Sequence, residues 1–267
     1  MRISVEALSW AAGDKVIVHD VDLDVRPHET VGLIGPNGSG KSTLLRCVAG
    51  LRAPSTGVVR YDGEDISGWS RRQVARRIAF VEQVSHADSD LRLIDVVGLG
   101  RTPFRDPWRG PTVIDRLVIE AAVERLGLTG LEERQWSTLS GGERQRAHIA
   151  RALAQQPYGI LLDEPTNHLD VRHQFELMEL LAGSEATVIV ALHDLSLAAR
   201  YCDRLVLLDG GTPVAAGTPD EVLSRDRLRS VFEMDAELGT DALGNPAVVY
   251  RSPISAAGRP TARRTAT

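Results

Sequence analysis

Two things are scarce in this sequence, cysteine and long apolar runs, and their scarcity excludes whole classes of protein. Among 267 residues only Cys47 and Cys202 are cysteines, each in a predicted helix and without the spacing of a metal site. Buried, reduced thiols are therefore expected, not a disulfide or a zinc site. The longest apolar runs, such as Val188 to Leu192, are far shorter than the roughly 20 residues that cross a bilayer. The N-terminus, MRISVEALSW, resembles a strand more than a signal peptide, so the chain is expected to remain in the cytosol.

The sequence also lacks a large excess of either charge. Its 31 basic and 36 acidic residues give a net charge of -5, which provides no general attraction to nucleic acid or anionic lipid. The hydrophobic content of 43% is sufficient for a packed core. The last 17 residues, 251–267, contain four arginines and no acid. They predict a basic, disordered tail, with lipid contact as the less favoured alternative.

Short apolar segments alternate with helical patterns, and this alternation predicts an α/β fold with a mainly parallel sheet. The segments expected in that sheet are Thr30 to Ile34, Ile78 to Val81, Gly159 to Leu162, Thr187 to Leu192 and Leu205 to Leu208. An antiparallel β layer is expected from Ile3 to Leu8, Val16 to Val25 and Val58 to Tyr61.

Between two of the sheet strands the pattern becomes helical, at Leu93 to Leu99 and at Val113 to Leu126. A stretch rich in proline and glycine, TPFRDPWRGP, separates these two helices. We interpret this region as a helical subdomain inserted at about residues 84–156 into a single domain of residues 1–250, which ends in a strand near 248–250.

The run GPNGSGKST lies between a strand-like segment and a helix-like one, and this context predicts a phosphate-binding loop. Its glycines allow successive N–H groups to turn inward, and the helix that follows adds its positive N-terminal end. Lys41 can reach the β- and γ-phosphates, and the Ser42 hydroxyl can ligate Mg²⁺. The predicted nucleotide-binding residues here are Gly35, Pro36, Asn37, Gly38, Ser39, Gly40, Lys41, Ser42 and Thr43.

A second group of candidate residues follows the buried strand in GILLDEPTNHLD, where two carboxylates stand at the strand's end. Asp163 is the predicted metal ligand, acting through water, and Glu164 is the predicted general base or water-orienting group. The alternative is an acidic strand terminus in a solvated loop. The complete phosphate loop elsewhere in the chain makes the functional interpretation the better one.

The segment LSGGERQRAHIARAL contains a helix start that can bind an anion. Ser140 and Glu143 form an S-x-x-E capping box, and Gly141 and Gly142 leave backbone N–H groups uncovered. The Ser140 hydroxyl can accept a bond from its own helix and still donate outward to a phosphate. Taken alone, such a segment is more often a simple helix cap.

In this order the motifs resemble those of the ATP-binding-cassette (ABC) ATPases, from about Ile3 to Tyr250. GPNGSGKST resembles the Walker A loop of that family and LLDE its Walker B strand. LSGGE resembles its signature and NHLD its D-loop. Gln83 in AFVEQ corresponds to the Q-loop glutamine, and His193 in LHD to the switch histidine.

The resemblance implies a P-loop NTPase core that hydrolyses ATP with Mg²⁺ as a head-to-tail homodimer. Each nucleotide would lie between the phosphate loop of one subunit and the signature of the other, so that Ser140 and Gly142 bind the γ-phosphate in trans. His193 would contact that phosphate from the same subunit as Lys41, and Asp170 would link the two sites. The resemblance also places Gln83 among both the catalytic residues and the Mg²⁺ ligands.

One position departs from the family pattern. Many of these ATPases stack adenine on an aromatic residue at the place that Ala12 occupies here. Trp10 lies two positions earlier and, on a strand, shares the face of Ala12, so it is a candidate for adenine stacking. Packing in the core is the equal alternative for Trp10.

Two further segments, VVGLGRTPF and NHLDVRHQFELMELL, resemble the importer branch that serves ferric siderophores, haem and cobalamin. The resemblance implies an ATPase subunit that couples hydrolysis to uptake of a ferric siderophore, with haem or cobalamin as alternatives. Its partners would be a second copy, a separate membrane permease and an extracytoplasmic binding protein, and it would lie at the cytoplasmic face of the membrane. GRTPF has a simpler explanation, a helix end broken by Pro103. A non-transport ABC ATPase acting on ribosomes or DNA is the less favoured class, and an exporter subunit is a lesser possibility.

Overall fold

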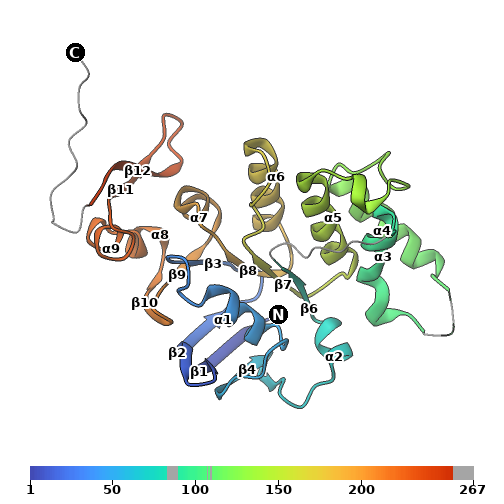
Figure 1. Ribbon diagram of the computed structural model, residues 1–267, viewed down its shortest axis with the longest axis horizontal. Helices are drawn as coiled ribbons and strands as arrows, with labels where there is room; N and C mark the ends of the chain where they lie inside the picture. The colour runs from blue at the N-terminus through green and yellow to red at the C-terminus, as the bar shows by residue number, and fades with distance from the viewer. Residues whose placement is uncertain (83–89, 107, 109, 255–267) are drawn as a thin grey trace.

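The computed structural model describes residues 1–82, 90–106, 108 and 110–254, and a six-stranded sheet forms its centre (Figure 1). The strands follow the order β10-β9-β3-β8-β7-β6. Their bounds are Thr30–Ile34 (β3), Ile78–Val81 (β6), Gly159–Asp163 (β7), Thr187–Ala191 (β8), Arg204–Asp209 (β9) and Thr212–Gly217 (β10). Neighbours from β9 to β6 pair in parallel, and β10 pairs antiparallel with β9 at the edge. The predicted α/β fold with a mainly parallel sheet is confirmed.

The sheet is covered on both faces, which explains why its strands are continuous apolar runs. Every residue of β8 is buried, and successive residues point to opposite faces. Val188 and Val190 pack into one apolar cluster, which contains residues of α5 (Gly141–Ala154), α6 (Val171–Ala182) and α7 (Leu195–Tyr201). Ile189 and Ala191 pack into the other, with α1 (Lys41–Val48) and the N-terminal β layer.

The N-terminal layer is an antiparallel sheet of order β2-β1-β4-β5. It comprises β1 (Ile3–Ala12), β2 (Lys15–Val25), β4 (Thr56–Tyr61) and β5 (Glu64–Asp65), and the short helix α2 (Arg71–Ala75) follows. Trp10 lies opposite Val18 and Ala11 lies opposite Val16, so Ile17 is an extra residue in β2. This irregularity matters because Ile17 lies beside the phosphate loop.

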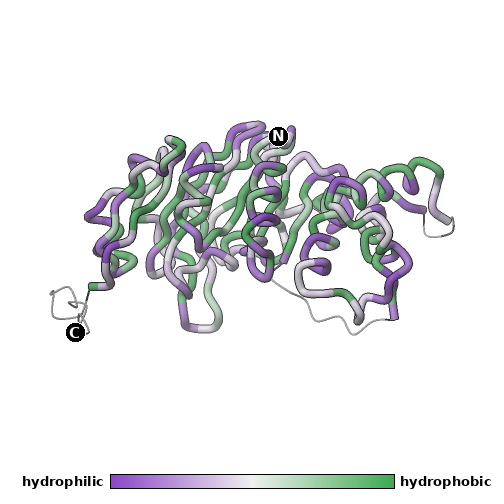
Figure 2. The backbone as a smooth tube through the Cα atoms, turned by 90° about the horizontal axis from the view of Figure 1, so that it is seen from above, coloured by the Kyte–Doolittle hydropathy of each residue, from purple (hydrophilic) through white to green (hydrophobic). Residues whose placement is uncertain are grey.

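The described part of the chain between β6 and β7 is mainly helical. Its helices are α3 (Leu93–Gly98), the 3₁₀ segment η1 (Leu99–Phe104), α4 (Val113–Arg125), the 3₁₀ turn η2 (Trp136–Thr138) and α5. Figure 2 shows these helices at one end of the elongated molecule and the last described strands, residues 234–253, at the other. Helix α3 gives way at Leu99 to the tighter η1, which contains Pro103. The subdomain bounds of about 84–156 stay a prediction.

The C-terminal part adds α8 (Pro219–Val222), α9 (Arg225–Val231) and a hairpin of β11 (Met234–Thr240) and β12 (Pro246–Pro253). The predicted tail boundary at residue 251 is too early, because Arg251–Pro253 belong to β12 and pair with β11. The remainder of the predicted disordered tail, 255–267, lies outside the described residues. Within the described ranges, every helix is too short or too polar to cross a membrane.

Candidate functional site

The phosphate loop connects the end of β3 to the start of α1, and two of its glycines are required by contacts with other strands. Gly35 has φ 146°, and a Cβ there would lie 2.0 Å from the carbonyl oxygen of Leu208. Gly40 has φ 96°, and a Cβ there would lie 2.9 Å from the carbonyl oxygen of Ile17. Gly40 is also the N-cap of α1, and no described side chain caps that helix start. The first N–H groups of α1 are thus available to an anion.

A cavity of about 140 Å³ lies over this loop. Its lining consists of Ile17, Asn37, Gly38, Ser39, Gly40, Lys41, Ser42, Thr43 and Glu164. The structure therefore brings the loop and the predicted general base together. Ile17 was not predicted from the sequence, because its place depends on the extra residue in β2.

The Lys41 side chain is buried within the phosphate loop. Its Nζ donates to the carbonyl oxygens of Gly35 and Pro36, at 2.8 and 3.1 Å. Burial lowers the pKa of Lys41, and the charges of Glu164 and Asp163 act in the opposite direction. The ammonium thus lies between the loop's own carbonyls and the carboxylates at the end of β7.

Asp163 is fully buried at the end of β7 and faces the first turn of α1. The Ser42 hydroxyl donates to Asp163 Oδ1 at 2.8 Å. Asp163 Oδ2 has no hydrogen-bond partner among the described residues, and the nearest cation is the Arg46 guanidinium at 3.9 Å. Burial raises the pKa of the Asp163 carboxyl, and the bond from Ser42 opposes that shift.

Arg46 was not predicted as a site residue, although its position in the sequence gave a signal. It follows Ser42 by one helical turn and so lies on the same face of α1. Its guanidinium also donates to Glu82 at 2.9 Å. Arg46 therefore adds positive charge beside the buried Asp163 carboxylate.

Glu164 is held in a strained position between two side chains. Its φ of 53° lies in the left-handed region, which is uncommon for a residue with a Cβ and typical of functional sites. One carboxylate oxygen lies 2.5 Å from Nε2 of His193, which follows β8. The other accepts a bond of 2.9 Å from the side-chain amide of Asn167. The structure thus joins Glu164 and His193 and adds Asn167, which the sequence analysis did not assign.

The predicted capping box at the start of α5 is confirmed. Ser140 Oγ accepts from the N–H of Glu143 at 3.2 Å, and the Glu143 carboxylate accepts from the N–H of Ser140 at 2.7 Å. Ser140 and Gly141 are exposed, and Gly142 is half-buried. The described residues that line the phosphate cavity do not include 140–143. Within one chain, the phosphate loop and this helix start are therefore separate.

The remaining predicted residues occupy different situations. Asp170 is the N-cap of α6 and accepts from the N–H of His173 at 2.9 Å, which lowers the pKa of its carboxyl. Trp10 packs against the core of the β layer, and the Arg52 guanidinium lies 4.5 Å from its ring centre. Part of the Trp10 side chain is therefore packed in the core, and its stacking on adenine stays a prediction. Gln83 lies outside the described residues.

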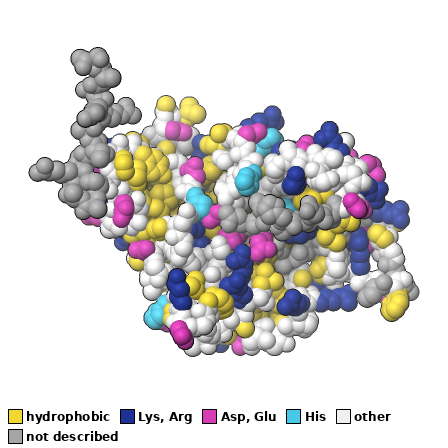
Figure 3. Space-filling view, viewed as in Figure 1, with side chains coloured by type: hydrophobic (Ala, Val, Ile, Leu, Met, Phe, Trp, Pro, Cys, Tyr) yellow, Lys and Arg dark blue, Asp and Glu magenta, His cyan; other side chains and the backbone are white. Residues whose placement is uncertain are grey.

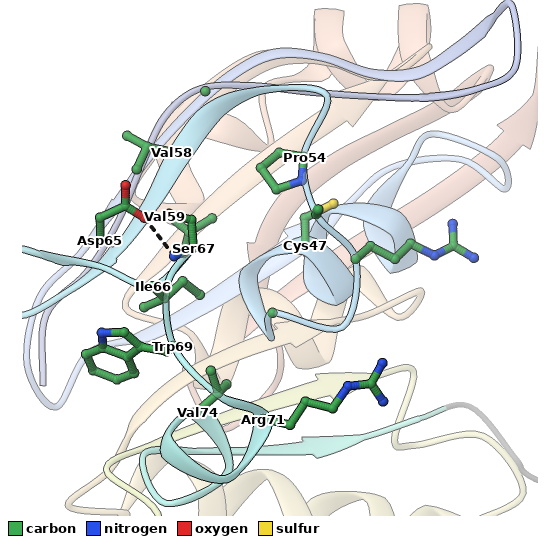
Figure 4. Close-up of a pocket in the computed structure, with 14 residues that line it drawn as sticks. Cys47, Pro54, Val58, Val59, Asp65, Ile66, Ser67, Trp69, Arg71 and Val74 are labelled. Carbon is green, nitrogen blue, oxygen red and sulfur yellow. Dashed lines mark hydrogen bonds between the residues drawn. The ribbon is translucent and has the colours of Figure 1, made fainter.

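A second cavity, of about 260 Å³, lies at the opposite end of α1 (Figure 4). Its walls include Cys47, Trp69 and Val74, and Asp65 accepts there from the N–H of Ser67 at 2.8 Å. Burial raises the pKa of the Cys47 thiol to about 11, so the thiol is protonated at neutral pH. Cys47 and Cys202 are both buried and free, as predicted from the sequence.

Comparisons with known proteins agree with this geometry. The family described as ABC transporter matches residues 18–167. A hemin import ATP-binding protein of Pseudomonas fluorescens is 43% identical over 248 residues, covering 90% of this chain and 96% of the relative. A petrobactin import ATP-binding protein of Bacillus anthracis is 37% identical over 249 residues, covering 91% of each chain.

Solved structures give the same result. A structure described as a metal-chelate type ABC transporter in an inward-facing conformation is 26% identical, with a TM-score of 0.80 over 93% of this chain and 97% of that one. A dimeric ATP-binding cassette with ADP and Pi is 28% identical, with a TM-score of 0.72 over 81% of this chain and 98% of that one. The chain therefore belongs to the ABC transporter family, as a subunit that binds and hydrolyses ATP.

Proposed function

We propose that the chain is the ATPase subunit of an importer that takes up an iron chelate, either haem or a ferric siderophore, through a separate permease. The observation that supports import is the likeness, over nine tenths of the chain, to proteins named for hemin and petrobactin import. The sequence motifs alone favoured a ferric siderophore. The relative named for hemin import is the more similar of the two, so the comparisons favour haem over a siderophore. A relative named for cobalamin import is 42% identical over 245 residues, so cobalamin has equal support as an alternative.

Glu164 is the proposed general base for the attack of water on the γ-phosphate. Its carboxylate takes the proton of the attacking water, and ADP leaves as the bond to the γ-phosphate breaks. Asn167 and His193 hold the two carboxylate oxygens, which fixes the direction in which the base faces. Lys41 exchanges the loop carbonyls for phosphate oxygens and neutralises their charge.

The residues at the end of β7 suit Mg²⁺, which typically takes one or two carboxylates together with substrate phosphates. Ser42 and Asp163 are the proposed ligands, and the buried Asp163 Oδ2, without a partner among the described residues, supports this role. Gln83 stays a predicted Mg²⁺ ligand, outside the described residues. When bound, Mg²⁺ would neutralise charge on the β- and γ-phosphate oxygens.

A head-to-tail homodimer is proposed because Ser140 and Gly141 of the signature are exposed and lie outside the phosphate cavity of their own chain. In a second copy, Ser140 and Gly142 would supply donors to the γ-phosphate. ATP would close the dimer by adding these contacts, and hydrolysis would remove them and move an attached permease. Binding to the permease would hold the chain at the cytoplasmic face of the membrane, with an extracytoplasmic binding protein delivering the substrate to the permease.

Uptake is tested in a strain that lacks only this chain, grown under iron limitation with haem or one ferric siderophore as the iron source. Wild type is expected to restore growth on one chelate, and Glu164→Gln is expected not to. Glu176→Gln, an exposed carboxylate that pairs with Arg172, is the matched control. Cobalamin-dependent growth is the third arm. Equal growth with and without the chain in all arms would overturn import, and nucleotide-stimulated binding to ribosomes or DNA would then favour the non-transport class.

A further inference from the structure

His193 lies between two backbone anchors, and the second of them is the start of α7. On one side, the N–H of Leu192 donates to the carbonyl oxygen of Leu33 at 3.0 Å, at the end of β3. On the other side, Asp194 caps α7 and its Oδ1 accepts from the N–H groups of Ser196 and Leu197, at 2.8 and 3.0 Å. The position of the first turn of α7 therefore determines where the His193 ring can lie.

The C-terminal hairpin packs against this turn. The backbone N–H of Val248, in β12, donates to Ser196 Oγ at 3.0 Å. Val248 also belongs to the same apolar cluster as Leu195 and Leu197 of α7. Ser196 thus links the cap of the turn to the hairpin, because its N–H donates to Asp194 and its hydroxyl accepts from the N–H of Val248.

Further contacts attach the hairpin to α7 at both ends of the helix. At its last turn, the Arg200 guanidinium lies 3.8 Å from Asp241, in the loop of the hairpin. At its first turn, burial raises the pKa of the Tyr250 hydroxyl, and the charge of the nearby Asp194 carboxylate adds to this shift. In Figure 1 the hairpin lies directly beside α7. The hairpin therefore contacts α7 at both its first and its last turn, and fixes the position of the whole helix.

We propose that the C-terminal hairpin is a positioning element for ATP hydrolysis, which acts through the Val248–Ser196 hydrogen bond on His193. The bond fixes the first turn of α7, and this turn keeps Nε2 of His193 against the Glu164 carboxylate. Ser196 is then a positioning residue for hydrolysis, because it lies three positions after His193 and outside the lining of the phosphate cavity. The inference rests on the roles proposed for His193 and Glu164.

The test measures kcat and KM for ATP hydrolysis by the full chain, with phosphate release as the readout. Ser196→Ala removes the acceptor, and we expect kcat to fall about 3- to 10-fold, the size that the loss of one hydrogen bond gives, with KM unchanged. Ser196→Thr keeps a hydroxyl and should recover most of the lost rate. Leu243→Ala, at the exposed hairpin tip where Figure 3 shows apolar side chains gathered, is the control and should match wild type.

A double-mutant cycle separates positioning from general destabilisation. In a His193→Ala background, Ser196→Ala should have no further effect on kcat, because the group that it positions is gone. An equal loss in both backgrounds would overturn the inference, as would an unchanged kcat in Ser196→Ala. If His193→Ala alone leaves kcat intact, the proposed mechanism fails and this inference fails with it. If His193→Ala lowers kcat and Ser196→Ala does not, the inference alone is overturned.

Discussion

Arg101 forms a buried ion pair that joins three elements of the helical region, and its removal should destabilise the protein strongly. Its Nε donates to Asp115, at the start of α4, at 2.8 Å, and both side chains are less than a tenth exposed, at 7% and 6%. A second nitrogen donates to the carbonyl oxygen of Ala154, at the end of α5, at 3.0 Å. The guanidinium also lies 4.4 Å from the ring centre of Phe104. This pair lowers the pKa of the Asp115 carboxyl to about 2, mainly through the bond from Arg101.

Arg101→Met keeps most of the side-chain volume and leaves the buried Asp115 carboxylate without its cationic partner, although the bonds from Thr112 remain. Breaking such a pair from one side costs about 3–5 kcal/mol of unfolding free energy. For a chain of this size, that loss corresponds to a decrease in melting temperature of roughly 6–10 °C. Thermal unfolding, followed by circular dichroism, measures the change.

Two further variants decide whether the ion pair is the cause. Arg2→Met removes an exposed pair with Asp24, whose side chains are 60% and 50% exposed, and should leave the melting temperature close to that of wild type. Adding Asp115→Asn to Arg101→Met removes the stranded charge and should recover part of the stability. Equal effects of Arg101→Met and Arg2→Met, or no recovery in the double variant, would refute the reasoning.

Three other predictions follow from the site and the core. Glu164→Gln should leave ATP binding intact and lower turnover by about 10²- to 10⁴-fold in a phosphate-release assay, and undiminished turnover would remove Glu164 from the base role. Lys41→Ala and Ser140→Arg should each be inactive alone, but mixing them should restore hydrolysis, because one site of the mixed dimer is complete; no recovery would count against composite sites. Burial lowers the pKa of His148 to about 4 from 6.5, so the stability that its neutral ring contributes is present above pH 6.5 and is lost as the pH falls toward 4. Phenylalanine cannot take up a proton, so in His148→Phe the unfolding free energy should fall less between pH 6.5 and 4, by up to about 3 kcal/mol, as measured by urea titration. An unchanged pH dependence would show that His148 is not the cause.

The sequence predicted the central sheet well because its strands are uninterrupted apolar runs. Every residue of β3, β7 and β8 is buried, so burial and pattern agree. The strands β10 and β11 were not predicted. TPVAAG and MDAELGT contain glycine, proline or acidic residues and lie at an edge or in a separate hairpin, where pairing and not hydrophobicity maintains the strand.

The site residues that lie in contiguous sequence motifs were predictable. The capping box of Ser140 and Glu143 is an example, since both partners lie within one helical turn. Contacts between distant segments were not predictable. Ile17 reaches the phosphate loop through an irregular strand register, and His193 reaches Glu164 from the end of a neighbouring strand. A periodic pattern carries no information on either.

The bonds from Lys41 to its own loop have a consequence for how the protein cycles between nucleotides. The ammonium ties the far end of the loop to the carbonyls of Gly35 and Pro36, so bonds within the loop itself hold its shape. Binding then exchanges one set of oxygen partners for another and does not order a flexible segment, which would cost about 1–2 kcal/mol for each residue. For the same reason, departure of ADP leaves behind a loop that is already receptive to the next ATP.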